Sequence, residues 1–207
     1  AIMSFSSLRQ EIAAAAARMI AEDGLDYSTA KRKAVKQLVG AGSLPRGDVL
    51  PDNDEIESEV REYQALFMGD TQPARLARLR RGALSVMDLL ERFQPYLVGP
   101  VWNGTAGEHS DVALQCFADS SKEVEIFLLN HGIKYEVGER PDFRGRGKVE
   151  ALYFLWQEEG VMLSIYDGLA LRGALKPGPD GRAERGDARA VARLLDDVEG
   201  RMQGETA

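Results

Sequence analysis

The sequence predicts an α+β protein, with an N-terminal helical region followed by a mixed sheet of about five strands. Apolar residues recur at steps of three and four through residues 8–93, which is the period of helices buried on one face. From residue 96 they form short runs separated by glycine-containing turns, the pattern of strands. We therefore expect a helical region over 1–95, an α/β core over 96–175, and a flexible loop with a final helix over 176–207.

Capping residues divide the first part into helices. Gly24 ends the first helix, and Ser28 is placed to cap the second. Asp52, with Glu55 three positions later, is a start signal for a third helix. A fourth follows Pro73 and stops before Pro95.

The fourth helix has heptad-like apolar spacing over residues 73–94, but for only about two and a half heptads. This length favours packing on the protein's own core. A homodimer seam along the same face is the alternative.

In the second part, each apolar run predicts a strand. The expected strands are 96–102, 112–117, 133–137, 149–156 and 161–166. A helix over 120–131 separates the second strand from the third, which is a βαβ-like order. Asp187 is placed to cap the final helix.

Composition excludes several classes of function. A formal net charge of −7 argues against a surface built mainly for nucleic acid or anionic membrane, and leaves local basic patches as the alternative. No apolar run approaches the ~18 residues of a membrane span, so we expect a cytoplasmic protein without membrane contact. One cysteine, Cys116, lies in an apolar run and is expected to be a buried, inert thiol. With only His109 and His131 beside it, a zinc site is not expected.

Residues 101–114 carry the most specific pattern in the chain. An apolar run leads to Gly104-Thr105, and Ser110-Asp111 opens the next apolar run. This arrangement resembles the nucleotidyltransferase superfamily, the polymerase-beta-like fold, whose hallmark is Gly-Ser at the end of one strand and Ser-Asp-x-Asp on the next. Gly104-Thr105 stands at the first motif, and Ser110-Asp111-Val112-Ala113 at the second. Ala113 replaces the second aspartate.

The resemblance implies a two-metal enzyme that transfers a nucleoside monophosphate to a hydroxyl. Asp111 would hold Mg²⁺, and Glu136, on the strand after the intervening helix, would stand for the family's third carboxylate. Their side chains should lie on the same face and close enough to share an ion or its waters. Gly104, Thr105 and Ser110 would bind the triphosphate. Mg²⁺ needs only one or two carboxylates when substrate phosphates complete its shell.

The replacement at Ala113 leaves two functions open. Without the second aspartate a two-metal clamp is hard to assemble, so a pseudoenzyme that binds triphosphate, with weak or no Mg²⁺ binding, stands beside an active transferase. The rival class is a non-enzymatic module that binds RNA, a nucleotide or a protein partner. Turn and capping duties are the structural alternative for Thr105, Ser110 and Asp111.

Basic residues form three clusters, which are Lys31-Arg32-Lys33 with Lys36, Arg75 with Arg78, Arg80 and Arg81, and Arg144-Gly145-Arg146-Gly147-Lys148. Charge runs on helices are usually solvated faces. The Arg-Gly loop is the stronger candidate, because arginine binds phosphate bidentately and glycine allows close approach. We expect Arg144 and Arg146 to contribute to triphosphate binding.

Overall fold

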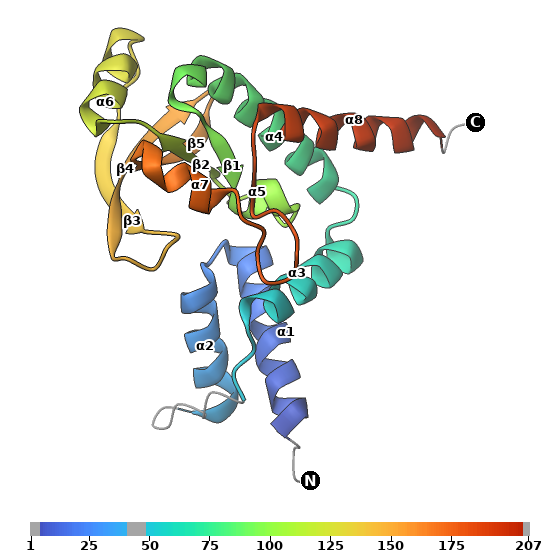
Figure 1. Cartoon of the computed structure of the whole chain (residues 1–207). Coiled ribbons are helices and arrows are strands. Elements are labelled where there is room, and N and C mark those ends of the chain that lie inside the picture. Colours follow the sequence, from blue (N-terminus) through green and yellow to red (C-terminus); the bar gives the residue numbers. More distant parts are fainter. Residues whose placement is uncertain (1–4, 41–48, 205–207) are drawn as a thin grey trace. The chain divides into compact units, whose positions relative to one another are not determined.

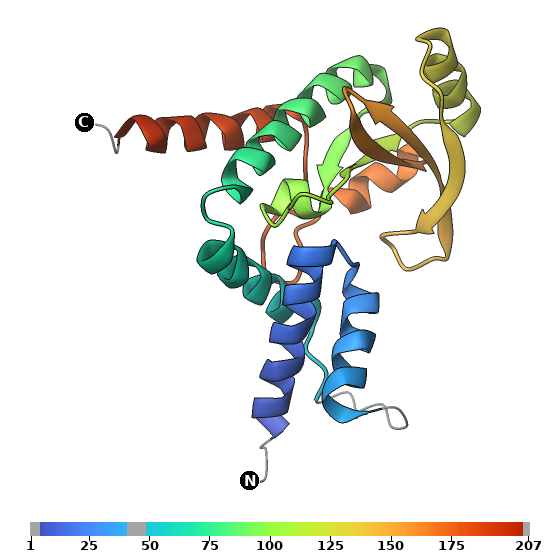
Figure 2. The ribbon, with the colours of Figure 1, turned by 180° about the vertical axis from the view of Figure 1, so that it is seen from behind.

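The computed structural model of the protein describes residues 5–40 and 49–204 (Figures 1 and 2). The chain divides into two compact units. Unit 1 comprises residues 1–75 and 105–109, and unit 2 comprises residues 76–104 and 110–207. The boundary between the two units falls within helix α4 (Gln72–Leu89), most of which belongs to the second unit.

Unit 1 is built from three helices, α1 (Phe5–Asp23), α2 (Tyr27–Val39) and α3 (Asn53–Phe67). α1 packs against both other helices, and α1 and α2 run side by side as a hairpin in both views (Figures 1 and 2). The core of this unit consists of small and branched side chains that are almost fully buried, among them Ile12, Ala16, Ala30, Ala34, Ile56 and Val60. Alanines at the α1–α2 contact allow the two backbones to approach closely.

Two capping predictions in unit 1 have different outcomes. Asp52 accepts a hydrogen bond from the Glu55 N–H and caps α3, as expected. The second helix is capped by Asp26 rather than Ser28, with the Asp26 carboxylate accepting from the Thr29 N–H at 2.8 Å. A carboxylate at the positive end of the helix dipole is the stronger of the two available caps.

α4 is followed by a 3-10 turn, η1 (Glu91–Phe93), and both contribute to the core of unit 2. The heptad-spaced residues Leu79, Ala83, Val86 and Leu90 are fully buried. The prediction that this face packs on the protein's own core is therefore confirmed. Because the face is already covered within one chain, it is not available as a homodimer seam.

Unit 2 contains a six-stranded sheet in the order β3-β4-β5-β2-β1-β6. The strands are β1 (Tyr96–Val98), β2 (Val112–Phe117), β3 (Glu136–Pro141), β4 (Lys148–Trp156), β5 (Glu159–Tyr166) and β6 (Arg185–Gly186). β2 and β5 are paired in parallel, and every other pairing in this sheet is antiparallel. The predicted α+β class with an N-terminal helical region is confirmed.

The first strand is shorter than predicted. It ends at Val98, and residues 99–103 form a short helix, α5 (Gly99–Asn103), instead of continuing to Trp102. Gly99 has φ = +69°, which breaks the extended run, and Pro100 then suits the first turn of a helix. β1 and β2 are neighbours, as expected.

The third strand is also displaced from its predicted place. It begins at Glu136, after helix α6 (Ser121–Asn130), and it occupies the edge of the sheet. β4 and β5 lie between it and β2. The strand–helix–strand order in the sequence therefore does not produce adjacent strands, and the parallel neighbour of β2 is β5, which follows much later in the chain.

Helices cover both faces of the sheet. On one face, Trp156 donates a hydrogen bond to Ser85 of α4 at 3.2 Å. On the other face, Phe117 and Tyr166 pack with two short elements, η2 (Gly168–Ala170) and α7 (Leu171–Ala174). The final helix, α8 (Ala188–Gly204), is capped by Asp187 as predicted.

In the parts of the chain that the structure describes, no helix combines the length and the apolarity that crossing a membrane requires.

Candidate functional site

The cross-strand register of unit 2 places Glu136 and Ala113 in one row on one face of the sheet. This row runs Val98, Ala113, Met162, Tyr153 and Glu136 across β1, β2, β5, β4 and β3. Side chains directly opposite one another in a sheet point to the same side. Glu136 and residue 113 therefore belong to the same face, and Asp111, two residues before Ala113, belongs to it as well.

Asp111 lies immediately before β2 and directly over the backbone of β5. A Cβ atom built on Gly160 would collide with the Asp111 carboxylate, so the glycine provides the space that the carboxylate occupies. Asp111 itself is exposed. An exposed carboxylate fixed at the start of a buried strand can bind a cation or a hydrogen-bond donor from solvent.

Asp111 and Glu136 lie on the same face of the sheet, but their strands are too far apart for both carboxylates to coordinate one ion directly. Two strands separate β2 from β3, and neighbouring strands are about 4.8 Å apart, so the two backbones stand about 14 Å from each other. Mg²⁺ holds its oxygen ligands at about 2.1 Å. This backbone separation does not favour direct coordination of one ion by both carboxylates; sharing of an ion through its waters stays a prediction.

The strand that does lie beside β2 carries no carboxylate at the corresponding position. Met162 of β5 is the direct partner of Ala113 in the parallel ladder. Ala113 is 7% exposed and offers only a methyl group. Among the described residues no group of three or more His, Cys, Asp or Glu side chains could hold a metal ion. Asp111 is thus a single carboxylate, which fits a metal ion only when a ligand's own phosphates complete the shell.

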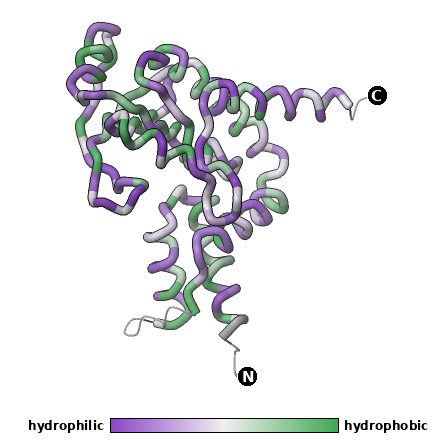
Figure 3. Tube along the Cα trace, viewed as in Figure 1, coloured by the Kyte–Doolittle hydropathy of each residue, from purple (hydrophilic) through white to green (hydrophobic). Residues whose placement is uncertain are grey.

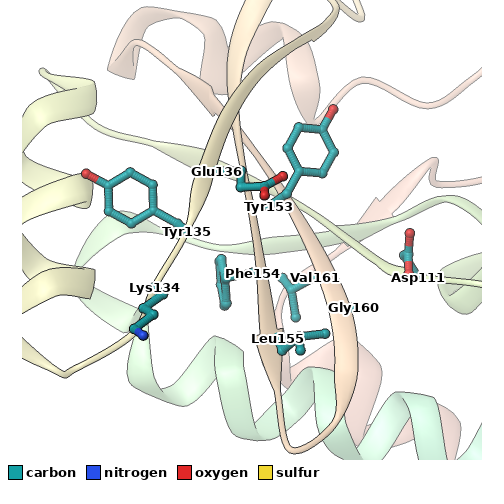
Figure 4. Close-up of a pocket in the computed structure, with 9 residues that line it drawn as sticks. All are labelled: Asp111, Lys134, Tyr135, Glu136, Tyr153, Phe154, Leu155, Gly160 and Val161. Atoms are coloured by element: carbon teal, nitrogen blue, oxygen red, sulfur yellow. The ribbon is translucent and has the colours of Figure 1, made fainter.

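Asp111 and Glu136 line one cavity of about 510 Å³ in unit 2. Figure 4 shows its lining residues, which are Asp111, Lys134, Tyr135, Glu136, Tyr153, Phe154, Leu155, Gly160 and Val161. This volume is in the range of small-molecule sites. The Tyr153 ring and the Glu136 carboxylate lie on the side of β3 that faces Asp111, whereas the Tyr135 ring points to the other side, toward Glu125 of α6 (Figure 4).

The aromatic side of the cavity is held by a close strand contact. Tyr153 of β4 lies across Gly138 of β3, where an added Cβ would come within 2.6 Å of Cε2 of the tyrosine ring. Burial and the nearby Glu125 carboxylate raise the pKa of Tyr135 above its ordinary value, so its hydroxyl stays protonated at neutral pH. A tyrosine ring can stack on a planar ligand, and its hydroxyl can hydrogen-bond.

The Gly-Thr pair is not in this cavity. Gly104 ends α5 with φ = +95°, and its N–H donates to the carbonyl of Pro100. That N–H is therefore used in a helix cap and does not serve a phosphate as predicted. Thr105 belongs to unit 1, where it is 5% exposed and its carbonyl accepts a hydrogen bond from Gln64 at 2.7 Å. Ser110 immediately precedes Asp111 and is half-buried.

The Arg-Gly loop lies at the far end of the β3–β4 hairpin from the cavity. Glu136 pairs with Tyr153 at one end of the hairpin, whereas Pro141 pairs with Lys148 at the other, next to the loop. Arg144 is paired with the buried Asp142 at 2.7 Å. Arg146 is exposed. The structure therefore does not bring Arg144 or Arg146 to Asp111, against the prediction.

The cysteine and the two histidines lie where a structural role explains them. Burial raises the pKa of the Cys116 thiol to about 12, which suits an inert core residue. His131 is the C-cap of α6, and its Nδ1 lies 2.8 Å from the carbonyl oxygen of Phe127. His109 is exposed in the 105–109 segment.

Sequence reasoning missed Lys134, Tyr135, Tyr153 and Met162 as site residues. All four lie in strands that the sequence predicted, but which of them meet across the sheet is decided only by the pairing of β3, β4 and β5. Comparison of the chain with protein-family models, with curated proteins and with solved structures gives no match.

Proposed function

We propose that unit 2 is a nucleotide-binding module of the nucleotidyltransferase type that does not catalyse transfer. The observation that carries the proposal is the row formed by Ala113 and Met162 beside Asp111. Asp111 supplies one carboxylate for a divalent ion, and the two neighbouring positions on the same face supply none. One carboxylate together with the phosphates of a ligand can hold Mg²⁺, but it cannot build a two-metal clamp.

The cavity supports binding by its chemistry. Tyr153 offers a ring for a base, and Lys134 offers a positive charge for phosphate. Stacking of a base on an aromatic side chain contributes about 1–3 kcal/mol in single-stranded complexes. Because Asp111 and Glu136 would repel bare phosphates, binding should require the ion.

The test compares two exposed aspartates at opposite ends of β2. Asp111→Asn removes the proposed ion ligand, and Asp119→Asn, beyond the other end of the strand, is the matched control. Calorimetry with ATP, GTP, CTP and UTP, each with Mg²⁺ or with EDTA, should give metal-dependent binding of at least one nucleotide. We expect Asp111→Asn to weaken it at least tenfold and Asp119→Asn to leave it within twofold.

Three results would contradict the proposal. Binding that is absent for all four nucleotides, or equal in Mg²⁺ and EDTA, removes the ion from the site. An equal loss in both aspartate variants removes Asp111. Release of pyrophosphate by the wild-type protein would instead contradict the loss of catalysis and restore the transferase alternative.

A further inference from the structure

One helix of unit 1 departs sharply from the acidic character of the whole protein. α2 carries four cations, Lys31, Arg32, Lys33 and Lys36, and no acidic residue between Tyr27 and Val39. The formal net charge of the chain is −7, so the remainder of the sequence carries −11 once these four charges are set aside. Positive charge is thus concentrated on one short element.

These cations are not neutralised by the helices around them. Within residues 5–40 and 49–204, none of the four forms an ion pair. The acidic side chains of unit 1 are concentrated on α3, where Glu55 pairs with Arg9 and Glu57 with Arg61. The carboxylate nearest in sequence, Asp26, caps α2, and its pKa is lowered mainly by hydrogen bonds from Thr29 and to a smaller extent by the charge of Arg32.

The cations face away from the core. Ala30, Ala34 and Val35 are the buried side of α2, whereas Arg32, Lys33 and Lys36 are exposed. Hydrophilic and hydrophobic segments alternate along this helix, as expected for one buried face (Figure 3). Successive residues are about 100° apart around a helix, so Arg32 and Lys33 diverge and Lys36, one turn later, lies between them.

This geometry matches the two phosphate rows that border the major groove of duplex DNA. The groove is about 12 Å wide and admits an α-helix of about 10–12 Å diameter. Long side chains diverging by about 100° reach opposite edges of such a groove. Thr29 lies between the cations on this face and Gln37 lies beside Lys33, and both are neutral and do not repel a polyanion.

We propose that the exposed face of α2 binds duplex DNA through phosphate contacts made by Arg32, Lys33 and Lys36. The contacts are to the backbone and therefore carry little sequence preference. With three phosphates neutralised, the logarithm of the binding constant should fall with the logarithm of salt concentration with a slope of about −2.7. Between 50 and 200 mM salt this corresponds to a loss of about 40-fold.

The test uses fluorescence anisotropy of the full chain with a labelled mixed-sequence DNA duplex of about one to two helical turns. The variant is Arg32→Gln, Lys33→Gln, Lys36→Gln. The control removes three exposed cations of the same types from unit 2, as Arg78→Gln, Arg81→Gln, Lys122→Gln. Both variants have the same net charge. At 50 mM salt we expect the α2 variant to bind the duplex at least tenfold more weakly than wild type. Its salt dependence should have a slope near zero, and the affinity of the control should change less than twofold.

Two further measurements cover a triple variant that loses its helical structure and binding to polyanions other than duplex DNA. If it is not helical by circular dichroism, the double variant Lys33→Gln, Lys36→Gln replaces it, with an expected slope of about −0.9. Single-stranded RNA of equal length and vesicles of phosphatidylcholine with phosphatidylserine are the competing polyanions. No binding of the duplex by wild type, an equal loss in the control, or tighter binding of RNA or vesicles than of duplex DNA would overturn the proposal.

Discussion

Two aspartates of unit 2 make the same local contact in different surroundings. Asp142 accepts hydrogen bonds from the N–H and guanidinium of Arg144, and Asp180 does the same for Arg182, in each case two residues later. The Asp142 side chain is 4% exposed and the Asp180 side chain 33%. A hydrogen bond lost inside the protein leaves its partners unsatisfied, whereas water replaces one lost at the surface.

Asp142→Asn should therefore reduce the free energy of unfolding by about 1–3 kcal/mol. Asp180→Asn is the control and should give a distinctly smaller reduction. Urea unfolding followed by circular dichroism measures both. An equal effect of the two substitutions would show that burial of the Asp142 pair contributes nothing.

The pH dependence follows from the same pair. The guanidinium of Arg144 lowers the pKa of Asp142 in the folded protein, so as pH falls the unfolded chain takes up the proton first. The stabilisation is present above the ordinary carboxyl pKa and is lost as pH falls through the lowered value. The difference between wild type and Asp142→Asn should accordingly stay constant from about pH 7 to 5 and shrink below about pH 4.

At the scale of elements, the parallel pair β2–β5 decides whether the sheet can hold a metal. Ala113 and Met162 are partners in this pair, and Asp111 lies two residues before Ala113. Carboxylates at both positions would complete a cluster with Asp111 on one face. Restoring position 113 alone would leave the neighbouring strand without a ligand.

Ala113→Asp, Met162→Glu should create a Mn²⁺ site. The double variant is expected to be less stable than wild type without metal, because three nearby carboxylates repel one another. Mn²⁺ at about 100 times its dissociation constant should raise the free energy of unfolding of the double variant by about 2.7 kcal/mol. The neutral variant Ala113→Asn, Met162→Gln is the control in thermal melts. If Mn²⁺ raises both melting temperatures equally, or neither, residues 113 and 162 do not face a common site.

The sequence predicted helices and strands well where the signal is local, and failed where it depends on pairing. The sequence predicts the caps at Asp52 and Asp187 and the buried face of α4, because each depends only on residues within or next to a single helix. It does not predict the order of strands, because β2 and β5 are joined by residues that include a helix and a hairpin. Glu136 was therefore placed beside Asp111 on sequence order, although β4 and β5 intervene.

Local backbone conformation explains the other failures at the site. An apolar run through Trp102 reads as a strand, but Gly99 adopts a positive φ and turns the chain into α5. Gly104 is consequently a helix cap. The composition of the Arg-Gly loop predicted a phosphate site, because arginine and glycine favour phosphate binding. In the structure Arg144 instead forms an ion pair with the buried Asp142, two residues before it.

At the scale of the whole molecule, unit 1 is assembled from two separate parts of the chain. Segment 105–109 joins residues 1–75, and side chains of the latter hold its backbone. Gln64 donates to the carbonyl of Thr105, Gln72 to that of Ala106 at 2.8 Å, and Arg75 to that of Glu108 at 3.3 Å. Gln64 is only 4% exposed, so its amide is a buried polar group that depends on this segment.

The two units should therefore lose protection separately, which native-state hydrogen exchange can resolve. Gln64→Leu removes the buried amide that donates to the Thr105 carbonyl, and it should destabilise unit 1 by about 1–3 kcal/mol. Hydrogen exchange of the α1 and α3 amides should then become about 5- to 150-fold faster, while exchange in β2 and β5 stays unchanged. Leu114→Ala in β2, which removes a fully buried side chain and should cost about 2–5 kcal/mol, is the reciprocal variant. It should accelerate exchange in the sheet and leave α1 and α3 unchanged. If either substitution accelerates exchange in both sets of amides equally, the chain opens as one cooperative unit, and the binding sites proposed on α2 and at Asp111 would have to be treated as energetically coupled.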